Sequence, residues 1–448
     1  MKKILTNFIL SYLRFFARIA LVINKPKVIG ITGSVGKSSS RNCIYAILKD
    51  HYPTKMLDKG NSETGIPLGI LGLSMIDYSF FDWLRVLILS PAGIFYLHGY
   101  QYLVIEMGID EPDPPKNMEY LLTIVKPHIA VILNIHPVHT MQFDKTVKES
   151  DLNTADRLDR ILTNIAKEKG KIITKSGSKV NIYNNENQYI RKVIVDFKAT
   201  KKNQTLLSFG LNNDNEIYFA DYQITRNGTS FTFCKKTEEL KVTINHYLLP
   251  KEYQEILAAV ILVGQAVGLT TVQTIESIER NFYLPEGRAS LFYGIRDSII
   301  IDSSYNASKA AVMAFLTMAN EIKIKEKRPL IFCFGDMKEL GEESAQEHTE
   351  VAKRITETVD YLYCVGDLTK KYMMGNIAGL KGIKWFENSF LLGKYLEENL
   401  PNSALVLVKG SQNNIFLEEA IKPILVDKND VLKLCRQEDY WLRKKIKA

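Results

Sequence analysis

Three short, predominantly apolar runs occur in the first third of the chain. They cover residues 27–32, 102–108 and 129–135, and segments of helical length separate them. Strands of a parallel sheet are buried on both faces, so they read as unbroken apolar runs. The pattern therefore predicts an α/β fold with crossover helices, the first of them over residues 38–52.

The pattern changes twice after this region. From about residue 179 to 247 the chain is rich in Asn, Thr and alternating β-forming residues, with an RNGT turn, which predicts a β-rich elaboration of the same domain. The stretch YLPEGRAS, near residue 285, indicates a linker into a second, Rossmann-like α/β domain. Its strands are expected at residues 298–304, 329–335, 361–366 and 404–410. The predicted organisation is an N-terminal helix over 1–26, a central domain over 27–285 and a C-terminal domain over 286–448.

The N-terminal segment has the pattern of an amphipathic helix. Its polar side chains follow helical spacing on a surface of Leu, Ile and Phe, and they are Lys3, Asn7, Ser11, Arg14 and Arg18. Charges inside the apolar stretch disfavour both a spanning helix and a cleavable signal, so secretion is not expected. Residues 4–23 are expected either to lie on a membrane surface or to pack on this protein or a partner.

Composition narrows the class of protein. A chain of 448 residues with 46% hydrophobic and 24% charged residues predicts a folded, multidomain protein. A net charge of +8 suits anionic ligands or an acidic membrane, but no dense Lys/Arg block indicates nucleic-acid binding. The five scattered cysteines fit reduced thiols. We expect a cytoplasmic protein, either free or peripheral at the inner face of the membrane.

A glycine-spaced loop follows the first predicted strand. Its sequence GSVGKS places backbone N–H groups, a lysine and a hydroxyl at the start of a helix, which is an arrangement that holds phosphates and Mg²⁺. The loop departs from the usual spacing, because Ile31 stands at the first glycine position. The expected nucleotide-binding residues here are Gly33, Ser34, Gly36, Lys37, Ser38 and Ser39.

Two further side chains end predicted strands of the same sheet. Glu106 lies at the end of YLVIEMG, where α/β proteins place ligands, and it is a candidate for holding magnesium. His139 follows the next strand and is a candidate for a second cation. By itself, a glutamate at a strand end is solvated in most proteins, and a lone histidine is more often a structural residue than a ligand.

Taken in order, several stretches resemble the Mur ligase family of ATP-dependent ligases, which add amino acids or dipeptides to cell-wall peptide precursors. The similarity spans roughly residues 27 to 425, and within the family it is greatest to ligases that add a D-alanyl-D-alanine dipeptide. The stretches are GITGSVGKSSS, NSETGIPLGIL, VIEMG, KPHIAVILNIHPVH, NIAKEKGKII, PEGRAS, IIIDSSYNAS, GDMKELGEE and VLVKGS. The resemblance implies a P-loop central ATPase domain followed by a Rossmann-like ligase domain.

The resemblance also implies roles for single residues. Lys37 would hold the phosphates, Ser38 and Glu106 would share one Mg²⁺, and His139 with a carbamylated Lys169 would hold a second. In the C-terminal domain, nucleotide or amine contacts would come from Arg288, Asp302 and Asn306, together with Tyr305, Lys409 and Ser411. Of these residues, Lys37, Lys169, His139 and Arg288 are the expected catalytic ones.

The reaction implied has two steps. ATP would phosphorylate the terminal carboxylate of a UDP-linked muropeptide-like precursor, and a D-Ala-D-Ala-like amine would displace the phosphate from the acyl phosphate. Two alternatives stay open: a ligase for another amino acid and another carboxylate acceptor, or a degenerate nucleotide-binding scaffold at the membrane.

Several positions depart from the family pattern. Ser303 replaces an aspartate, Glu255 stands where an asparagine near the adenine is expected, and the segment 61–65 keeps its glycine but changes its amides. A separate N-terminal domain that grips uridine diphosphate is also not expected, because only about 26 residues precede the first strand.

Overall fold

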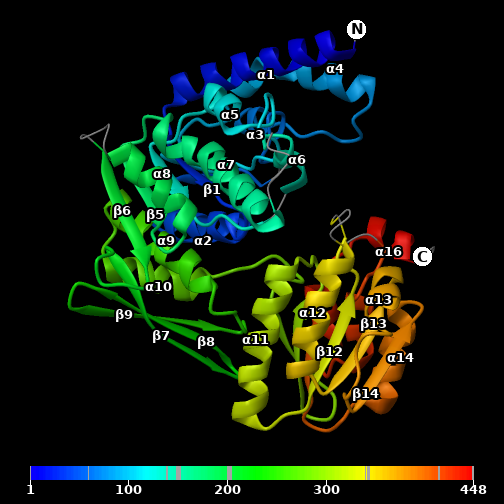
Figure 1. Ribbon diagram of the computed structural model, residues 1–448. Helices are drawn as coiled ribbons and strands as arrows, with labels where there is room; N and C mark the ends of the chain where they lie inside the picture. Colours follow the sequence, from blue (N-terminus) through cyan, green and yellow to red (C-terminus); the bar gives the residue numbers. More distant parts are fainter. Residues whose placement is uncertain are drawn as a thin grey trace. The chain divides into compact units, whose positions relative to one another are not determined.

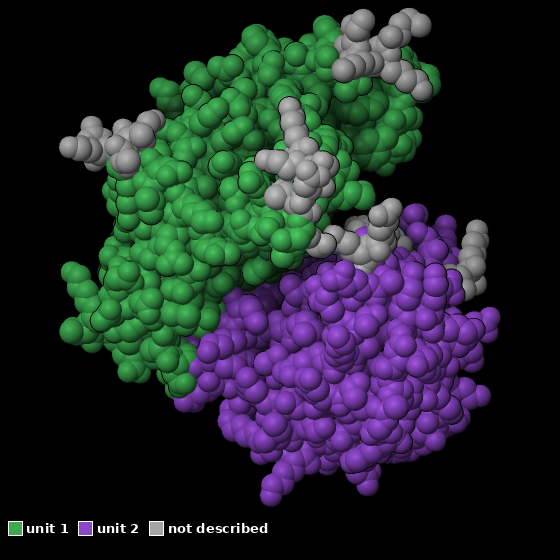
Figure 2. Space-filling view, viewed as in Figure 1, with its two compact units in different colours: residues 1–221, 232–242, 254–283 green, residues 222–231, 243–253, 284–448 purple. Residues whose placement is uncertain are grey.

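A computed structural model of the chain describes residues 2–58, 60–137, 140–147, 153–198, 204–338, 340, 344–411 and 414–445. The fold is mixed α/β and contains two sheets rich in parallel strands (Figure 1). The chain divides into two compact units, coloured separately in Figure 2. Unit 1 contains residues 1–221, 232–242 and 254–283, and unit 2 contains residues 222–231, 243–253 and 284–448.

The first sheet has nine strands in the order β2-β3-β1-β4-β5-β6-β7-β8-β9. Pairing is parallel from β2 to β7, and two-residue turns join β7, β8 and β9, a connection that antiparallel neighbours allow. The strands are β1 (Lys27–Thr32), β2 (Thr54–Met56), β3 (Tyr102–Glu106), β4 (Ile129–Ile132), β5 (Val180–Asn184), β6 (Thr205–Gly210), β7 (Ile217–Thr225), β8 (Gly228–Lys235) and β9 (Glu238–Asn245).

The helices that accompany this sheet lie between residues 2 and 281. They are α1 (Lys2–Asn24), α2 (Lys37–Lys49), α3 (Gly65–Ile70), α4 (Phe80–Leu89), the 3₁₀ helix η1 (Ala92–Phe95), α5 (Met118–Ile124), α6 (Thr140–Asp144), α7 (Thr154–Thr174), α8 (Gln188–Lys198), α9 (Tyr253–Val267) and α10 (Thr271–Asn281). A single hydrophobic core joins side chains of α1, α5, α7 and α8 to strands β1, β3, β4 and β5.

The second sheet has six strands in the order β10-β11-β15-β12-β13-β14, and only its edge strand β10 is antiparallel. The strands are β10 (Ser290–Gly294), β11 (Ser298–Ser303), β12 (Leu330–Gly335), β13 (Tyr361–Val365), β14 (Gly382–Phe386) and β15 (Leu405–Lys409). The helices of this part are α11 (Lys309–Glu326), α12 (Ser344–Thr358), α13 (Asp367–Tyr372), α14 (Ser389–Asn399), α15 (Glu418–Ile421), η3 (Lys422–Ile424), η4 (Lys428–Lys433) and α16 (Asp439–Lys445).

The predicted α/β fold is confirmed, and the apolar runs form strands within two or three residues of the expected bounds. One local prediction is wrong, because the region read as β-rich also contains helix α8. Its buried side chains are Ile190, Ile194 and Phe197. Their spacing of four and three residues puts them on one face of a helix, and that face packs into the core of unit 1.

The amphipathic N-terminal segment is a helix, as predicted, and it packs on unit 1. Leu13, Ala17 and Ala20 are buried in the core, while Asn24 donates a 2.7 Å hydrogen bond to the carbonyl of Ile94 in η1. Residues Leu5–Asn24 are long and apolar enough to cross a membrane by length and composition alone. The buried inner face makes α1 part of the domain it precedes.

Candidate active site

The loop between β1 and α2 has a backbone conformation that favours glycine. Gly36 has φ of 82°, a conformation that side chains with a Cβ rarely adopt. A Cβ built at this position would lie 3.2 Å from Cδ1 of Ile256. Helix α2 starts at the next residue without a side-chain cap, so the amides of its first turn are available to an anion.

The loop is tied to the end of β4 by Asn134. The amide of Ser34 donates to the Asn134 carbonyl at 2.9 Å, and the amide of Val35 donates to Oδ1 of Asn134 at 3.0 Å. Nδ2 of Asn134 in turn donates to Oε2 of Glu255 at 3.1 Å. Glu255, which departs from the family pattern, therefore has a structural role: its carboxylate accepts from the side-chain amide of Asn134, the residue that holds the loop. Asn134 is not among the predicted site residues, although its place near the end of a predicted buried strand was a usable signal.

Ser38 and Glu106, the two residues expected to share one Mg²⁺, lie side by side. The Ser38 hydroxyl donates a 2.7 Å hydrogen bond to Oε2 of Glu106, and Nδ2 of Asn61 donates to Oε1 at 3.1 Å. The Arg41 guanidinium lies 3.9 Å from the same carboxylate. A hydroxyl and a carboxylate side by side are the hard oxygen donors that Mg²⁺ prefers, and this ion commonly takes its remaining ligands from water and phosphate.

Two lysines share the electrostatic environment of Glu106. Nζ of Lys37 donates to the carbonyl of Ser34 at 3.0 Å. Desolvation lowers the pKa of Lys37, and the negative charges of Glu106 and Asp110 oppose this change. Asp110 follows β3 by four residues and was not singled out from the sequence.

Lys169, on α7, is almost completely buried, with 3% of its surface exposed. Burial and then the nearby positive charge of Lys37 lower the pKa of Lys169 to about 7, against the attraction of Asp110 and Glu106. Near neutral pH a large fraction of this amine is therefore uncharged. The structure thus groups Lys37, Ser38, Glu106 and Lys169 within one electrostatic environment of unit 1.

His139 lies outside the described residues, so its position is not part of this grouping. The described histidine of the same stretch, His136, contacts the loop through its backbone amide, which donates to Ser34 Oγ at 3.0 Å. Burial lowers the pKa of the His136 imidazole. Within the described ranges, no three His, Cys, Asp or Glu side chains are grouped as a metal cluster.

In unit 2 the predicted residues gather at the ends of neighbouring strands. Strands β11 and β15 pair in parallel, and their register places Ser303 beside Lys409. Nζ of Lys409 donates to Ser303 Oγ and to the Asn306 carbonyl, both at 3.0 Å. Ser303, which replaces an aspartate of the family pattern, therefore binds the lysine. Burial, followed by the charge of Arg288, lowers the pKa of Lys409 to about 7, and Asp302 opposes this change.

Arg288 and Asp302 retain unused hydrogen-bonding capacity. The Arg288 guanidinium lies over the ring of Tyr305, 4.8 Å from its centroid. Among the described residues, Nε of Arg288 and Oδ2 of Asp302 are buried without a hydrogen-bond partner. Burial raises the pKa of Asp302 to about 6. Buried polar atoms are rarely left unpaired, so these two atoms fit a site that takes a polar ligand.

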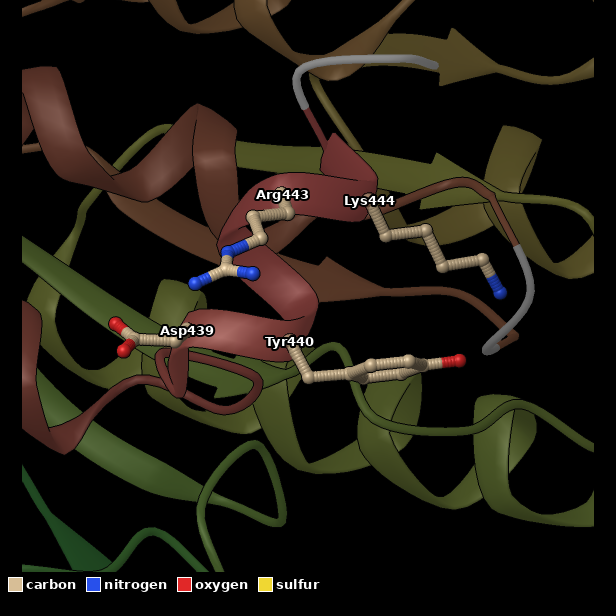
Figure 3. A pocket seen from close by; sticks show the side chains of 4 residues that line it. All are labelled: Asp439, Tyr440, Arg443 and Lys444. Carbon is tan, nitrogen blue, oxygen red and sulfur yellow. The ribbon is translucent and has the colours of Figure 1, made fainter. Parts of the chain in front are cut away.

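A surface recess of about 500 Å³ lies elsewhere in unit 2, on α16 (Figure 3). It is lined by Asp439, Tyr440, Arg443 and Lys444, whose side chains extend from one short helix. The recess contains none of the predicted site residues, and we assign it no part in the site.

Comparison with known proteins gives family matches along most of the chain. Residues 31–149 and 155–263 match the family described as Mur ligase middle domain, and residues 287–412 match Mur ligase, glutamate ligase domain. A relative from Buchnera aphidicola, UDP-N-acetylmuramoyl-tripeptide–D-alanyl-D-alanine ligase, is 24% identical over 405 residues, which are 88% of this chain and 75% of that protein.

Two solved structures have a similar fold. MurF ligase from Thermotoga maritima in complex with ADP has a TM-score of 0.70 at 21% identity, with coverage of 94% of this chain and 84% of that one. MurF from Acinetobacter baumannii has a TM-score of 0.69 at 19% identity, with coverage of 92% and 79%.

Proposed function

Because the chain belongs to the Mur ligase family, we propose that it is an ATP-dependent carbon–nitrogen ligase of cell-wall peptide synthesis. The acceptor is a UDP-linked muropeptide-like precursor, and the incoming amine is D-alanyl-D-alanine or a similar dipeptide. The reaction takes place in the cytoplasm. The name of the Buchnera relative supports this choice of substrates.

In this proposal the central region of the chain is a P-loop ATP-binding domain with a β-rich elaboration. The C-terminal region is a Rossmann-like ligase domain. The boundaries that we propose are residues 27–285 and 286–448. The loop at Gly33–Ser39, with the uncapped start of α2 and the amine of Lys37, supports nucleotide binding. The unpaired Nε of Arg288 and Oδ2 of Asp302 support a second set of polar contacts, together with Asn306.

Magnesium fits the donor set beside the loop. Ser38 and Glu106 would hold one ion, because their oxygens already lie 2.7 Å apart and both are hard ligands. A second ion would be held by His139 and by Lys169 after carbamylation, a reaction that converts the amine into an anionic oxygen ligand. Lys169 suits that reaction, since burial keeps much of its amine neutral near pH 7. When bound, the ions would neutralise charge on the phosphates.

The reaction then needs little covalent chemistry from the protein. An oxygen of the acceptor carboxylate attacks the γ-phosphorus of ATP, and the bond to ADP breaks. The amine next attacks the acyl carbon of this acyl phosphate and expels phosphate, with loss of one proton from nitrogen. The residues of the loop act by position and charge: Lys37 offsets the negative charge that moves between the phosphoryl oxygens.

One observation carries the proposal: the Ser38–Glu106 contact lies in the same electrostatic environment as the two lysines with lowered pKa, Lys37 and Lys169. A degenerate scaffold has no need to keep two buried amines beside a carboxylate. Buried charges are costly to maintain, and perturbed pKa values concentrate at functional sites.

The test is phosphate release from ATP, measured with the tripeptide precursor and D-alanyl-D-alanine separately and together. We expect release only with both substrates, and loss of at least a hundredfold in Lys37→Ala. The matched control is Lys49→Ala, an exposed lysine at the other end of α2. ATP binding without turnover would support a degenerate nucleotide-binding scaffold instead. Turnover with a different amine, from a panel of amine substrates, would support a ligase for another amino acid.

A further inference from the structure

Helix α1 has two apolar faces, and the protein covers only one of them. Leu10, Leu13, Ala17 and Ala20 are buried against unit 1. On the outer side, Leu5, Phe8, Phe15 and Val22 repeat at spacings of three or seven residues and are more than half exposed. These spacings align the outer side chains as one stripe along the helix. Packing on unit 1 therefore accounts for one of these two faces and leaves the other uncovered.

The segment that leads into α4 has the same property. Ile76, Tyr78, Phe80 and Phe81 are all more than 70% exposed, and Ile88 continues the exposed face of the helix. Half of the large apolar side chains that the described residues leave exposed lie within residues 5–23 and 76–96. Soluble monomers rarely concentrate their exposed apolar side chains in this way, and such patches mark sites of interaction.

The turn that presents these side chains is held in place by a buried carboxylate. Oδ2 of Asp82 accepts hydrogen bonds from the amides of Ile76 at 2.6 Å and Tyr78 at 3.2 Å. Its Oδ1 accepts from Nη2 of Arg85 at 2.6 Å. The hydroxyl of Ser79 caps α4 by accepting from the amide of Asp82 at 3.2 Å. Exposure of the apolar side chains is therefore built into an ordered turn.

The two segments are neighbours. The hydroxyl of Tyr12, on α1, donates to the carbonyl of Leu87, on α4, at 3.1 Å. Both helices lie along the same border of unit 1 in Figure 1. We call the exposed apolar side chains of residues 5–23 and 76–89 the α1/α4 surface.

Charge favours a lipid bilayer as the occupant of this surface. The first 49 residues contain no Asp or Glu, and Arg18 on the polar stripe of α1 and Lys25 just after the helix are exposed. The turn before α4 adds one exposed carboxylate, Asp77, so basic side chains outnumber acidic ones around the surface. A cationic border beside exposed Phe and Leu is the composition of helices that lie in the interface of anionic membranes. The inner face of α1 is part of the core, and Arg14 contacts Tyr120 and Thr123 of α5, so the helix cannot cross a bilayer without exposing that core.

We propose that the α1/α4 surface docks this protein on an anionic lipid bilayer, with α1 and α4 parallel to the membrane plane and their outer side chains among the headgroups. The apolar side chains supply the binding energy, and the basic residues near α1 select anionic lipid. This proposal is independent of the reaction proposed above, because it uses none of the site residues.

Flotation of the full chain with vesicles tests the proposal. The probes are vesicles of phosphatidylcholine alone and of phosphatidylcholine with phosphatidylglycerol. We expect the protein to float with the anionic vesicles and to bind the neutral ones more weakly. The variant Phe8→Ser/Phe15→Ser/Phe80→Ser/Phe81→Ser is expected to bind anionic vesicles at least tenfold more weakly. These side chains are exposed, so the fold should persist, which circular dichroism checks.

The matched control is Val272→Ser/Leu432→Ser. These two apolar side chains lie outside the α1/α4 surface and are 61% and 80% exposed. We expect this control to float like the unchanged protein. Absence of flotation with anionic vesicles would overturn the proposal, as would equal flotation of the quadruple variant. A dimer in sedimentation that dissociates in the quadruple variant, without vesicle binding, would also overturn it and would assign the surface to a second copy.

Discussion

The hydroxyl of Ser38 lies 2.7 Å from Oε2 of Glu106, although 68 residues separate the two in the chain. Strands β1 and β3 pair in parallel with Ile31 opposite Glu106, so the sheet register brings the start of α2 to the carboxylate. This contact joins the loop before α2 to a candidate magnesium ligand.

The variant Glu106→Gln is expected to weaken the response to magnesium. An amide keeps the volume of the side chain but lacks the negative charge that a divalent ion requires. We expect the Mg²⁺ concentration for half-maximal phosphate release to rise at least tenfold, about 1.4 kcal/mol. The control is Glu111→Gln, a carboxylate of the following loop that pairs with Lys116 at 2.9 Å. An unchanged Mg²⁺ requirement in Glu106→Gln would remove this residue from the site.

The variant Asn134→Ala is expected to weaken nucleotide binding without unfolding the protein. It leaves the partly buried amide of Val35 without its acceptor, and loss of such a hydrogen bond costs about 1 kcal/mol. We expect the Kd for ATP, from a fluorescence titration, to rise about tenfold. Asn187→Ala is the control, because Asn187 donates to the carbonyl of Ile135, next to the same strand, and makes no bond to the loop. Equal effects of the two variants would contradict an anchoring role for Asn134.

Lys169 is expected to react with CO₂ in a pH-dependent way. Only the neutral amine reacts, and burial, with the charge of Lys37, places the pKa of Lys169 at about 7. At a fixed concentration of dissolved CO₂, the carbamate fraction should therefore rise as the pH increases through about 7. The measurement is the ¹³C NMR carbamate signal with labelled CO₂.

Lys169→Met should lose this signal, and Lys171→Met should keep it. Burial alone would lower the pKa of Lys171, but its bonds to Glu168 and Glu119 raise it, so this amine stays charged. A signal that survives in Lys169→Met would show that another amine carries the carbamate.

Lys409 is expected to make unit 2 more stable as the pH rises above neutrality. Burial and Arg288 lower the pKa of Lys409 to about 7 from 10.5, so between these values the unfolded chain holds a proton that the folded chain lacks. The free energy of unfolding then increases with pH, and the gain is lost as the pH falls through about 7. From pH 7 to pH 9 the gain is about 2 kcal/mol, and Lys409→Met should abolish it.

Urea unfolding at the two pH values measures this effect. In a Trp83→Phe background, fluorescence follows Trp385 and Trp441, which both belong to unit 2. Lys394→Met, which changes an exposed lysine of α14, is the control and should keep the pH dependence of the unchanged chain. The same dependence in Lys409→Met would mean that another group causes it.

Much of the fold could be predicted because the signals are local. Unbroken apolar runs placed β1, β3 and β4, and the spacing of Gly36, Lys37 and Ser38 placed the phosphate loop at the start of a helix. Helix α8 was not predicted, because the stretch around it is rich in β-forming residues. The buried positions of α8 nevertheless repeat at helical spacing. The turn before α4 was not predicted. It depends on hydrogen bonds from backbone amides to Asp82, and the sequence does not show such bonds.

The sequence by itself determined the α/β class, the helix start that follows the glycine-spaced loop, and the family, since these depend on residue type and on spacing along the chain. Only the tertiary structure decided which distant groups interact: the Asn134 side chain bonds to the backbone amide of Val35, the Lys409 amine bonds to the Ser303 hydroxyl, and the charge of Lys37 acts on the amine of Lys169. It also decided which face of α1 is covered. Strand order and helix packing set these contacts, and burial sets the charge of each amine, because the cost of removing water exists only in the folded chain.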